Sequence, residues 1–157
     1  MIPAFVGLGA PYWNMDTRGA IFGITRDTTR EQIVRAAEKS IALQSMDIIE
    51  AMQNDSGKKI HELRVDGGAT KDRYLMQYQA DILDIPVLLP DVTESTALGA
   101  AYLAGITAKV YNTVSEVAKL NTIRNRFDPD MSQGERRRQR ALWKNAVSRL
   151  LCDETQH

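Results

Sequence analysis

The feature that most constrains the fold is a change of pattern within residues 62–83, ELRVDGGATKDRYLMQYQADIL. The segment begins as a buried strand, meets Gly67 and Gly68, and continues with apolar side chains at helical spacing. The short apolar run VLL follows before Pro90 and indicates a second strand. Strand–helix units with short connections predict a parallel α/β sheet, in which ligands gather at the carboxyl ends of the strands.

Further helices are expected on both sides of this unit. Thr28 and Glu31 have the spacing of a capping box, and apolar residues then recur near the helical period. This pattern predicts a long helix from about residue 29 to residue 53. The segment 93–105, TESTALGAAYLAG, predicts another helix, whose small side chains would allow close packing against a neighbouring sheet or helix.

A terminal helix is predicted after a polar connection. Ser132 and Glu135 repeat the capping-box spacing, and apolar residues follow at helical intervals, so this helix is expected to pack back on the rest of the chain. It also carries a run of positive charge that we interpret as a solvated face. The run consists of Arg136, Arg137, Arg138 and Arg140.

The sequence thus divides into three regions of one domain. Residues 1–27 hold several glycines and prolines and predict short strands joined by tight turns. Residues 28–105 form the expected α/β core, and residues 106–157 form a carboxyl-terminal helical segment. We expect an incomplete α/β domain made of parallel strand–helix units plus a terminal helix.

Composition excludes several classes of partner. Twenty basic residues balance twenty acidic ones, so no overall field favours nucleic acid or an anionic membrane. The apolar stretches are shorter than the roughly 18 residues needed to span a bilayer. The single Cys152 excludes an intrachain disulfide framework, and we expect it to be a buried or inert thiol in a reducing compartment. These features favour a cytoplasmic protein.

The glycine pair is the candidate binding site. Gly67 and Gly68 lack a Cβ, so they can take positive φ and let a flat or charged ligand lie against the main chain. The helix that follows begins with unpaired N–H groups that favour anions or polar ligand atoms. The corner therefore suits a nucleotide, although a glycine pair between a strand and a helix also occurs as a simple turn. Asp66 is either a ligand contact or a capping carboxylate.

A resemblance to a known family rests on five blocks: PAFVGLGAPYW, RGAIFGITR, RAAEKSIALQSMDIIEAM, LRVDGGATKDRYLMQYQADIL and TESTALGAAYLAG. In order and spacing, the chain resembles the carboxyl-terminal part of the glycerol kinases, within the FGGY carbohydrate kinase family. The resemblance covers nearly the whole chain, and the RGAIFG block favours glycerol kinases over the related pentulose kinases.

The resemblance implies a fold, a reaction and a set of contacts. The fold is that of the actin-like ATPases, with two ribonuclease H-like domains around a cleft in which ATP and Mg²⁺ drive phosphoryl transfer to glycerol. The family's Gly-Gly-Ala turn lies against the adenosine, which here corresponds to Gly67, Gly68 and Ala69. The family's Asn at the adenine is replaced by Asp72, which when ionised accepts hydrogen bonds but does not donate them.

The resemblance also implies that essential parts lie before the first residue. These parts are the sugar-binding domain, the catalytic Asp, the phosphate-gripping loops and the first three strands of the second domain. We therefore expect no catalytic residue and no metal ligand in this chain, and no turnover by the chain alone. An uncovered edge at the strand around residues 63–65 further predicts either a homo-oligomer or association with the missing amino-terminal part.

No other residue offers an alternative chemistry. His61 has no partner at metal-ligand spacing, and Asp16 with Arg18 indicates a turn-stabilising pair. Tyr12 and Trp13 are expected to fill a core or an interface. Three hypotheses remain: a part of an ATP:glycerol phosphotransferase or of a related pentulose kinase, a nucleotide-binding module without catalysis, and an assembly piece that binds neither nucleotide nor glycerol.

Overall fold

The computed structural model describes residues 1–92 and 94–152, and its centre is a three-stranded sheet. The strands β1 (Leu63–Arg64), β2 (Val87–Pro90) and β3 (Ile123–Phe127) lie in the order β1-β2-β3. β1 and β2 are parallel, as the strand–helix pattern predicts. β3 pairs antiparallel with β2 and was not predicted, because its sequence IRNRF shows no apolar alternation and only Phe127 is buried.

The long helix α1 (Arg30–Ser56) begins one residue later than its predicted capping box implies. Thr29 and Gln32 form the box, each side chain bonding the backbone N–H of the other. The predicted pair Thr28 and Glu31 is therefore wrong by one position, and the Thr28 hydroxyl instead accepts a hydrogen bond from Thr25 N at 2.8 Å. α1 ends at Gly57, whose φ of 65° is the left-handed conformation usual after a helix.

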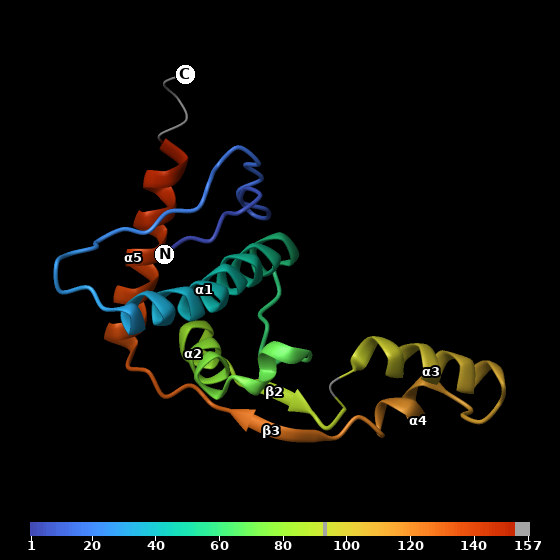
Figure 1. Ribbon diagram of the computed structural model, residues 1–157. Helices are drawn as coiled ribbons and strands as arrows, with labels where there is room; N and C mark the ends of the chain where they lie inside the picture. The colour runs from blue at the N-terminus through green and yellow to red at the C-terminus, as the bar shows by residue number, and fades with distance from the viewer. Residues whose placement is uncertain (93, 153–157) are drawn as a thin grey trace.

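The hydrophobic core lies on one side of the sheet (Figure 1), between α1, α2 (Arg73–Leu83) and α5 (Gln133–Cys152). Ile82 of α2 and Val87 of β2 are fully buried, and Trp143 and Val147 bring α5 into the same core. The terminal helix thus packs back as expected. The Ser132 hydroxyl accepts a hydrogen bond from Glu135 N at 3.3 Å, so the half of the predicted capping box that Ser132 supplies is formed.

The arginine run on α5 is not a uniformly solvated face, which corrects the interpretation of that charge run. Arg136 is buried, and its guanidinium donates to the carbonyl of Asp81 at 2.6 Å and pairs with Asp84 at 2.8 Å. Arg140 donates to the carbonyl of Ile82 at 3.1 Å. Both arginines therefore satisfy carbonyls at the carboxyl end of α2, where cations are also favoured by the helix dipole.

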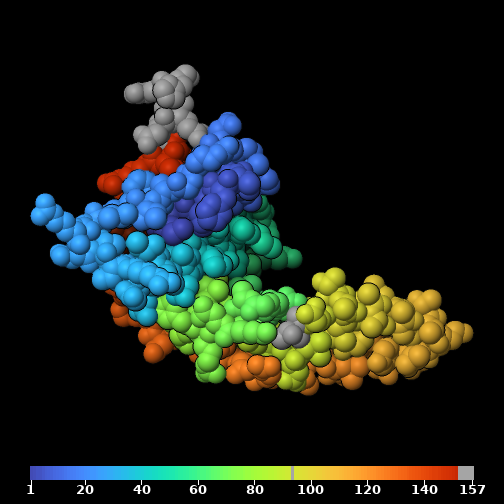
Figure 2. All heavy atoms as spheres, viewed as in Figure 1, coloured from blue at the N-terminus to red at the C-terminus, as the bar shows by residue number. Residues whose placement is uncertain are grey.

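The helix α3 (Ser95–Thr107) and the short helix α4 (Val114–Ala118) form an arm that projects from the body (Figures 1 and 2). None of the residues of α3 is buried, so the close packing expected from its small side chains does not form. Within the arm, the rings of Tyr102 and Tyr111 meet edge to face at 6.0 Å. The predicted first residue of this helix, Thr93, lies outside the described residues, as does the side chain of Cys152.

The amino-terminal region is irregular, with isolated bridges between Ile2 and Ala20 and between Leu8 and Asn14. Ile2 and Leu8 are buried in the core, so this region packs against the helices. Arg18 donates to the carbonyls of residues 15, 16 and 17 at 2.8–3.0 Å, the turn-stabilising role expected of it. No helix in the described part of the chain is long and apolar enough to cross a membrane.

Candidate nucleotide-binding site

The site is built at the carboxyl end of β1. Leu63 N and Val65 N donate to the β2-side carbonyls of Pro86 and Leu88 at 2.9 and 3.0 Å, and the chain then leaves the sheet. The carboxylate of Asp66 accepts a hydrogen bond from Ser95 N at 3.2 Å. Of the two roles considered for Asp66, the structure thus shows the capping one, and the helix that it holds is α3 rather than α2. This bond keeps the end of β1 beside the beginning of α3.

The backbone conformation at position 67 requires glycine. Its φ of 88° and ψ of −178° lie in a region that is essentially restricted to glycine. Two hydrogen bonds hold its carbonyl, from Thr70 N at 3.2 Å and from Thr70 Oγ1 at 2.7 Å. Thr70 is buried, so these hydrogen bonds tie the turn to the packed interior of the chain.

Gly68 needs another explanation, because its φ lies outside the left-handed region. It begins the 3-10 turn η1 (Gly68–Lys71) and is exposed. A Cβ built at either Gly67 or Gly68 would meet no atom of the described residues within 4 Å. Packing within the described chain therefore does not require a glycine at position 68, and the bare backbone leaves open space above the turn.

Ala69 and Asp72 complete the predicted set. Ala69 is exposed on η1, and its carbonyl accepts a hydrogen bond from Asp72 N at 3.1 Å. The half-buried carboxylate of Asp72 accepts a hydrogen bond from Leu75 N at 3.0 Å and so caps α2. The four sequence-predicted residues thus lie along one turn between β1 and α2, with Asp72 engaged by its own helix.

No group of three or more His, Cys, Asp or Glu side chains within residues 1–92 and 94–152 is placed to hold a metal ion. His61 is exposed ahead of β1. The geometry of the turn provides accessible backbone and an open surface, which suit the flat face and polar atoms of a nucleotide.

A buried polar cluster that was not predicted from the sequence joins Asp47 of α1 to Tyr12 and to Trp143 of α5. The Asp47 carboxylate accepts hydrogen bonds from Tyr12 Oη at 2.9 Å and from Trp143 Nε1 at 2.6 Å. Burial raises the pKa of Asp47, against the lowering effect of these two donors, and burial together with Asp47 raises the pKa of Tyr12. The available signal was a lone Asp between Met46 and Ile49 on the buried face of a helix.

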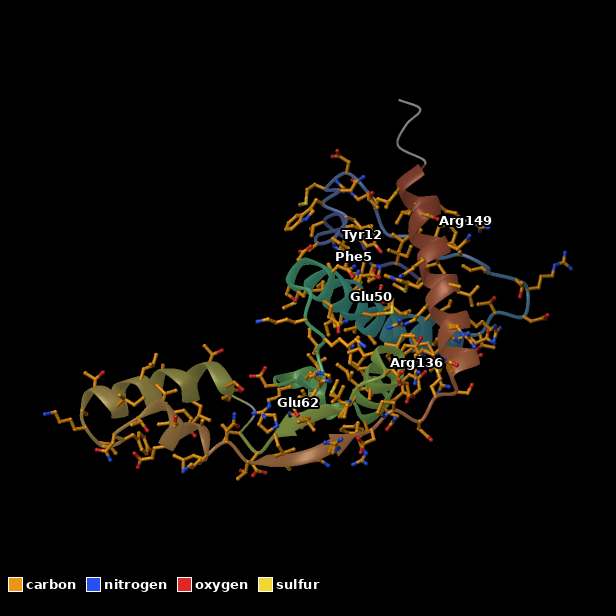
Figure 3. The ribbon with its side chains drawn as sticks, turned by 180° about the vertical axis from the view of Figure 1, so that it is seen from behind. Phe5, Tyr12, Glu50, Glu62, Arg136 and Arg149 are labelled. Carbon is orange, nitrogen blue, oxygen red and sulfur yellow. The ribbon has the colours of Figure 1, made fainter. Side chains whose placement is uncertain are left out.

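The cluster also separates two aromatic residues that the sequence analysis treated together. Tyr12 joins the packed interface between the amino-terminal region and α1, near Glu50 (Figure 3). Trp13 is 76% exposed, so it does not fill the core of this chain, and the interface expected as the alternative stays a prediction for this residue. Because Asp47, Tyr12 and Trp143 satisfy one another, we assign this cluster a structural role.

Comparison with known proteins supports the sequence resemblance. Residues 1–108 match the model of the carboxyl-terminal domain of the FGGY family of carbohydrate kinases. Glycerol kinase 2 of Thermotoga maritima is 56% identical over 150 residues, which are 96% of this chain and 30% of that protein. A glycerol kinase of Xanthomonas axonopodis pv. citri is 52% identical over 147 residues, again 30% of its length. The chain therefore spans about three tenths of these curated relatives.

Solved structures agree on the fold. A crystal structure of Plasmodium falciparum glycerol kinase with ADP superimposes with a TM-score of 0.86 at 37% identity, covering 96% of this chain and 30% of that one. A xylulose kinase from Lactobacillus acidophilus gives 0.76 at 23% identity, covering 94% and 31%, and shows likeness of fold alone. The predicted ribonuclease H-like, actin-like ATPase class is confirmed. By its match over residues 1–108, the chain belongs to the FGGY family of carbohydrate kinases, in the region of that family's carboxyl-terminal domain.

Proposed function

We propose that this chain supplies the adenosine-binding part of an ATP-dependent glycerol kinase, which converts ATP and glycerol to ADP and glycerol 3-phosphate. The observation that carries the proposal is the anchored turn at Gly67 and Gly68, with open space above it at the carboxyl end of a parallel strand. Support also comes from the Plasmodium falciparum glycerol kinase, which was solved with ADP and is 37% identical to this chain over the aligned region, 30% of that protein.

In this proposal the ligand lies along the main chain of Gly67, Gly68 and Ala69. Backbone groups at this turn bind the nucleoside without a side chain between them, because the two glycines have none. Asp72 lies at the end of the turn, where its carboxylate already accepts a hydrogen bond from Leu75 N. An ionised carboxylate has no proton to donate, so we expect Asp72 to contact the base more weakly than an amide would.

The chain is not expected to turn over by itself. Phosphoryl transfer requires an aligned acceptor and donors or metal ions that neutralise the phosphate oxygens. Mg²⁺ would supply that neutralisation, but the described residues contain no cluster that fits it, so we assign the chain no step in that chemistry. We propose that the groups that hold glycerol, the phosphates and the metal correspond to the other seven tenths of the relatives' length.

The proposed partners follow from this separation of nucleotide binding from the groups that carry out phosphoryl transfer. One partner is ATP or ADP at the glycine turn. The other is a polypeptide segment that carries the glycerol-binding and phosphate-binding groups. Association with a second copy of this chain is the alternative way to cover the apolar surface that such a segment would cover. Because ATP is the phosphoryl donor, we place the activity in the cytoplasm. The binding role alone, without any kinase partner, is the second candidate, and the turn held by Thr70 with open space beside Gly67 and Gly68 supports it for the isolated chain.

Nucleotide affinity tests the assignment of the site. We expect Gly68→Asp to weaken ATP and ADP binding, measured by calorimetry, at least about tenfold, because the new carboxylate fills the open space and repels phosphate. Gly134→Asp is the matched control, since Gly134 also has open space around it in the described chain and lies in the first turn of α5. Equal ATP affinity in the wild type and Gly68→Asp would refute the site.

Turnover tests the separation of binding from catalysis. We expect no glycerol-dependent ADP release above the background of Gly68→Asp prepared in the same way. Release by the wild-type chain alone would show that these residues also contain the groups that align glycerol and neutralise phosphate. That result would overturn the assignment of a binding role without catalysis.

A further inference from the structure

The peptide group between Gly67 and Gly68 has one polar atom held and the other free. The carbonyl oxygen of Gly67 accepts hydrogen bonds from Thr70 N at 3.2 Å and from Thr70 Oγ1 at 2.7 Å. These two donors occupy both lone pairs of that oxygen. The N–H of Gly68, at the other end of the same peptide group, donates to no residue within 1–92 and 94–152.

The shape of the peptide group determines where this free N–H points. The cis peptide among the described residues is Ala10–Pro11, so the bond between Gly67 and Gly68 is trans. In a trans peptide the C=O and N–H groups point in opposite directions. Because the carbonyl points to the buried Thr70, the Gly68 N–H points away from the interior. The space around Gly68 is open, so a ligand can reach this donor.

The two glycines also make this orientation easy to lose. A peptide group turns over when ψ of the residue before it and φ of the residue after it rotate together. Side chains normally restrict these two angles, but neither Gly67 nor Gly68 has a Cβ. The turned-over peptide would present the Gly67 carbonyl, an acceptor, where the Gly68 N–H now lies. The turn therefore offers a donor to a ligand only while another group holds the carbonyl inward.

The side chain of Thr70 is suited to this task. Thr70 is 7% exposed, so water competes little for its hydrogen bond to Gly67. Its hydroxyl lies closer to the Gly67 oxygen than its backbone nitrogen does. Any residue other than proline at position 70 supplies the backbone N–H, but the hydroxyl requires threonine or serine. The identity of this side chain thus sets how firmly the peptide group is held.

We propose that Thr70 is a positioning residue for nucleotide binding, which holds the peptide group so that Gly68 N–H donates to an acceptor atom of the nucleotide. This inference rests on the proposed function and adds to it a side chain that does not itself touch the ligand. Without the hydroxyl, part of the molecules present the carbonyl, which repels the same acceptor. The apparent affinity then falls by the fraction of molecules that still present the donor.

A pair of substitutions separates the hydroxyl from the volume of the side chain. Thr70→Val keeps the shape but removes the hydroxyl, and should weaken ADP binding about tenfold in calorimetry. Thr70→Ser keeps the hydroxyl and should bind ADP within about twofold of the wild type. Thr107→Val is the matched control, since the Thr107 hydroxyl also donates to a backbone carbonyl, that of Leu103 at 3.0 Å, but at the end of α3. This control should leave ADP affinity unchanged.

The orientation of the Gly68 N–H provides a readout that a merely structural role would not change. Residual dipolar couplings of the ligand-free chain report this orientation. We expect the coupling of Gly68 to agree with the structure in the wild type and in Thr70→Ser, and to depart from it in Thr70→Val. Urea unfolding of all the variants verifies that each is folded under the conditions of the binding measurement.

The outcomes distinguish this inference from the proposed function. Equal ADP affinity in the wild type and Thr70→Val overturns the positioning role while the nucleotide site stands. Weaker binding by Thr70→Val with an unchanged Gly68 orientation also overturns it, and so does a Thr70→Ser variant that binds as weakly as Thr70→Val. A wild-type chain that binds no ADP refutes the proposed function, and the inference is overturned with it.

Discussion

The helices α2 and α3 each follow a strand of the same parallel pair, yet only α2 is built into the core. α2 buries seven residues of RYLMQYQADIL, a sequence with several polar side chains. α3 buries none of STALGAAYLAGIT, although its sequence is the more apolar of the two. The difference shows that apolar content makes burial favourable, but a second element must be present to provide the covering surface.

Contacts from α1 and α5 explain the position of α2. Tyr78 and Ile82 are buried in the cluster that contains Met46 of α1, and Arg136 and Arg140 of α5 bind carbonyls at the end of α2. The contacts of α3 are local, with Asp66 at its beginning and Tyr111 near its end. Stability should therefore be concentrated in the body, with little contribution from side chains of the arm.

The largest expected effect is at the centre of α2. Ile82→Ala removes a fully buried side chain and should lower the free energy of unfolding by about 2–5 kcal/mol, from lost burial and the remaining cavity. Urea unfolding followed by circular dichroism measures the change. A loss below about 1 kcal/mol would mean that α2 is not a core helix in solution.

The contact between α5 and the end of α2 should rank second. Arg136→Met keeps the aliphatic stem but leaves the carbonyl of Asp81 without its charged donor, and should cost about 2–3 kcal/mol. Arg137→Met is the matched control on the next residue, where the exposed side chain should contribute less than about 0.5 kcal/mol. Equal losses in the two variants would contradict the proposed anchoring of α2 by Arg136.

The buried carboxylate of Asp47 predicts a pH dependence. Its pKa is raised in the folded chain, so the native state binds the proton more tightly and its stability falls as the pH rises through the folded pKa. Asp47→Asn keeps an oxygen that accepts from Tyr12 and Trp143 but has no charge to desolvate.

The free energy of unfolding of Asp47→Asn should therefore rise relative to that of the wild type as the pH rises. We expect this difference to be smaller than the losses in Ile82→Ala and Arg136→Met, because the substitution conserves the packing. Urea unfolding from pH 4 to pH 8 measures this difference, with Asp55→Asn as an exposed control on the same helix. Parallel pH profiles for the wild type and Asp47→Asn would contradict the prediction.

The smallest effect is expected in the arm. Leu103→Ala removes a side chain that is 67% exposed on α3, and should change the free energy of unfolding by less than about 0.5 kcal/mol. This variant is the direct counterpart of Ile82→Ala. A loss comparable with that of Ile82→Ala would show that α3 is covered in solution, for example by another polypeptide, and would remove the contrast between the two helices.

Much of the fold follows from local sequence pattern. The parallel pair β1 and β2, the helices α1, α2 and α5 and the glycine turn are each specified by residues close together in the chain. The start of α1 was misplaced by one residue, because two overlapping threonines offer the same capping chemistry and only the three-dimensional geometry decides between them. β3 escaped prediction because its stability comes from pairing with β2 rather than from its own pattern.

At the candidate site, too, some features follow from local sequence and others depend on the tertiary structure. That Gly67 and Gly68 form a turn suited to a nucleotide follows from their position between a strand and a helix. The capping of α3 by Asp66 and the engagement of Asp72 by Leu75 N are hydrogen bonds whose partners depend on how the chain folds. The predictions of nucleotide contacts at these residues stay open to the affinity test.

The sequence by itself determined the helices α1, α2, α3 and α5, the parallel strand pair, the bare backbone at the glycine turn and the family, because periodicity, the missing Cβ and the ordered blocks are properties of neighbouring residues. Only the tertiary structure decided that Arg136 is buried, that Asp47 is shared by Tyr12 and Trp143, and that α3 stands apart from the core. The physical reason is that burial and pairing depend on which distant elements meet, and those contacts form only when the chain folds.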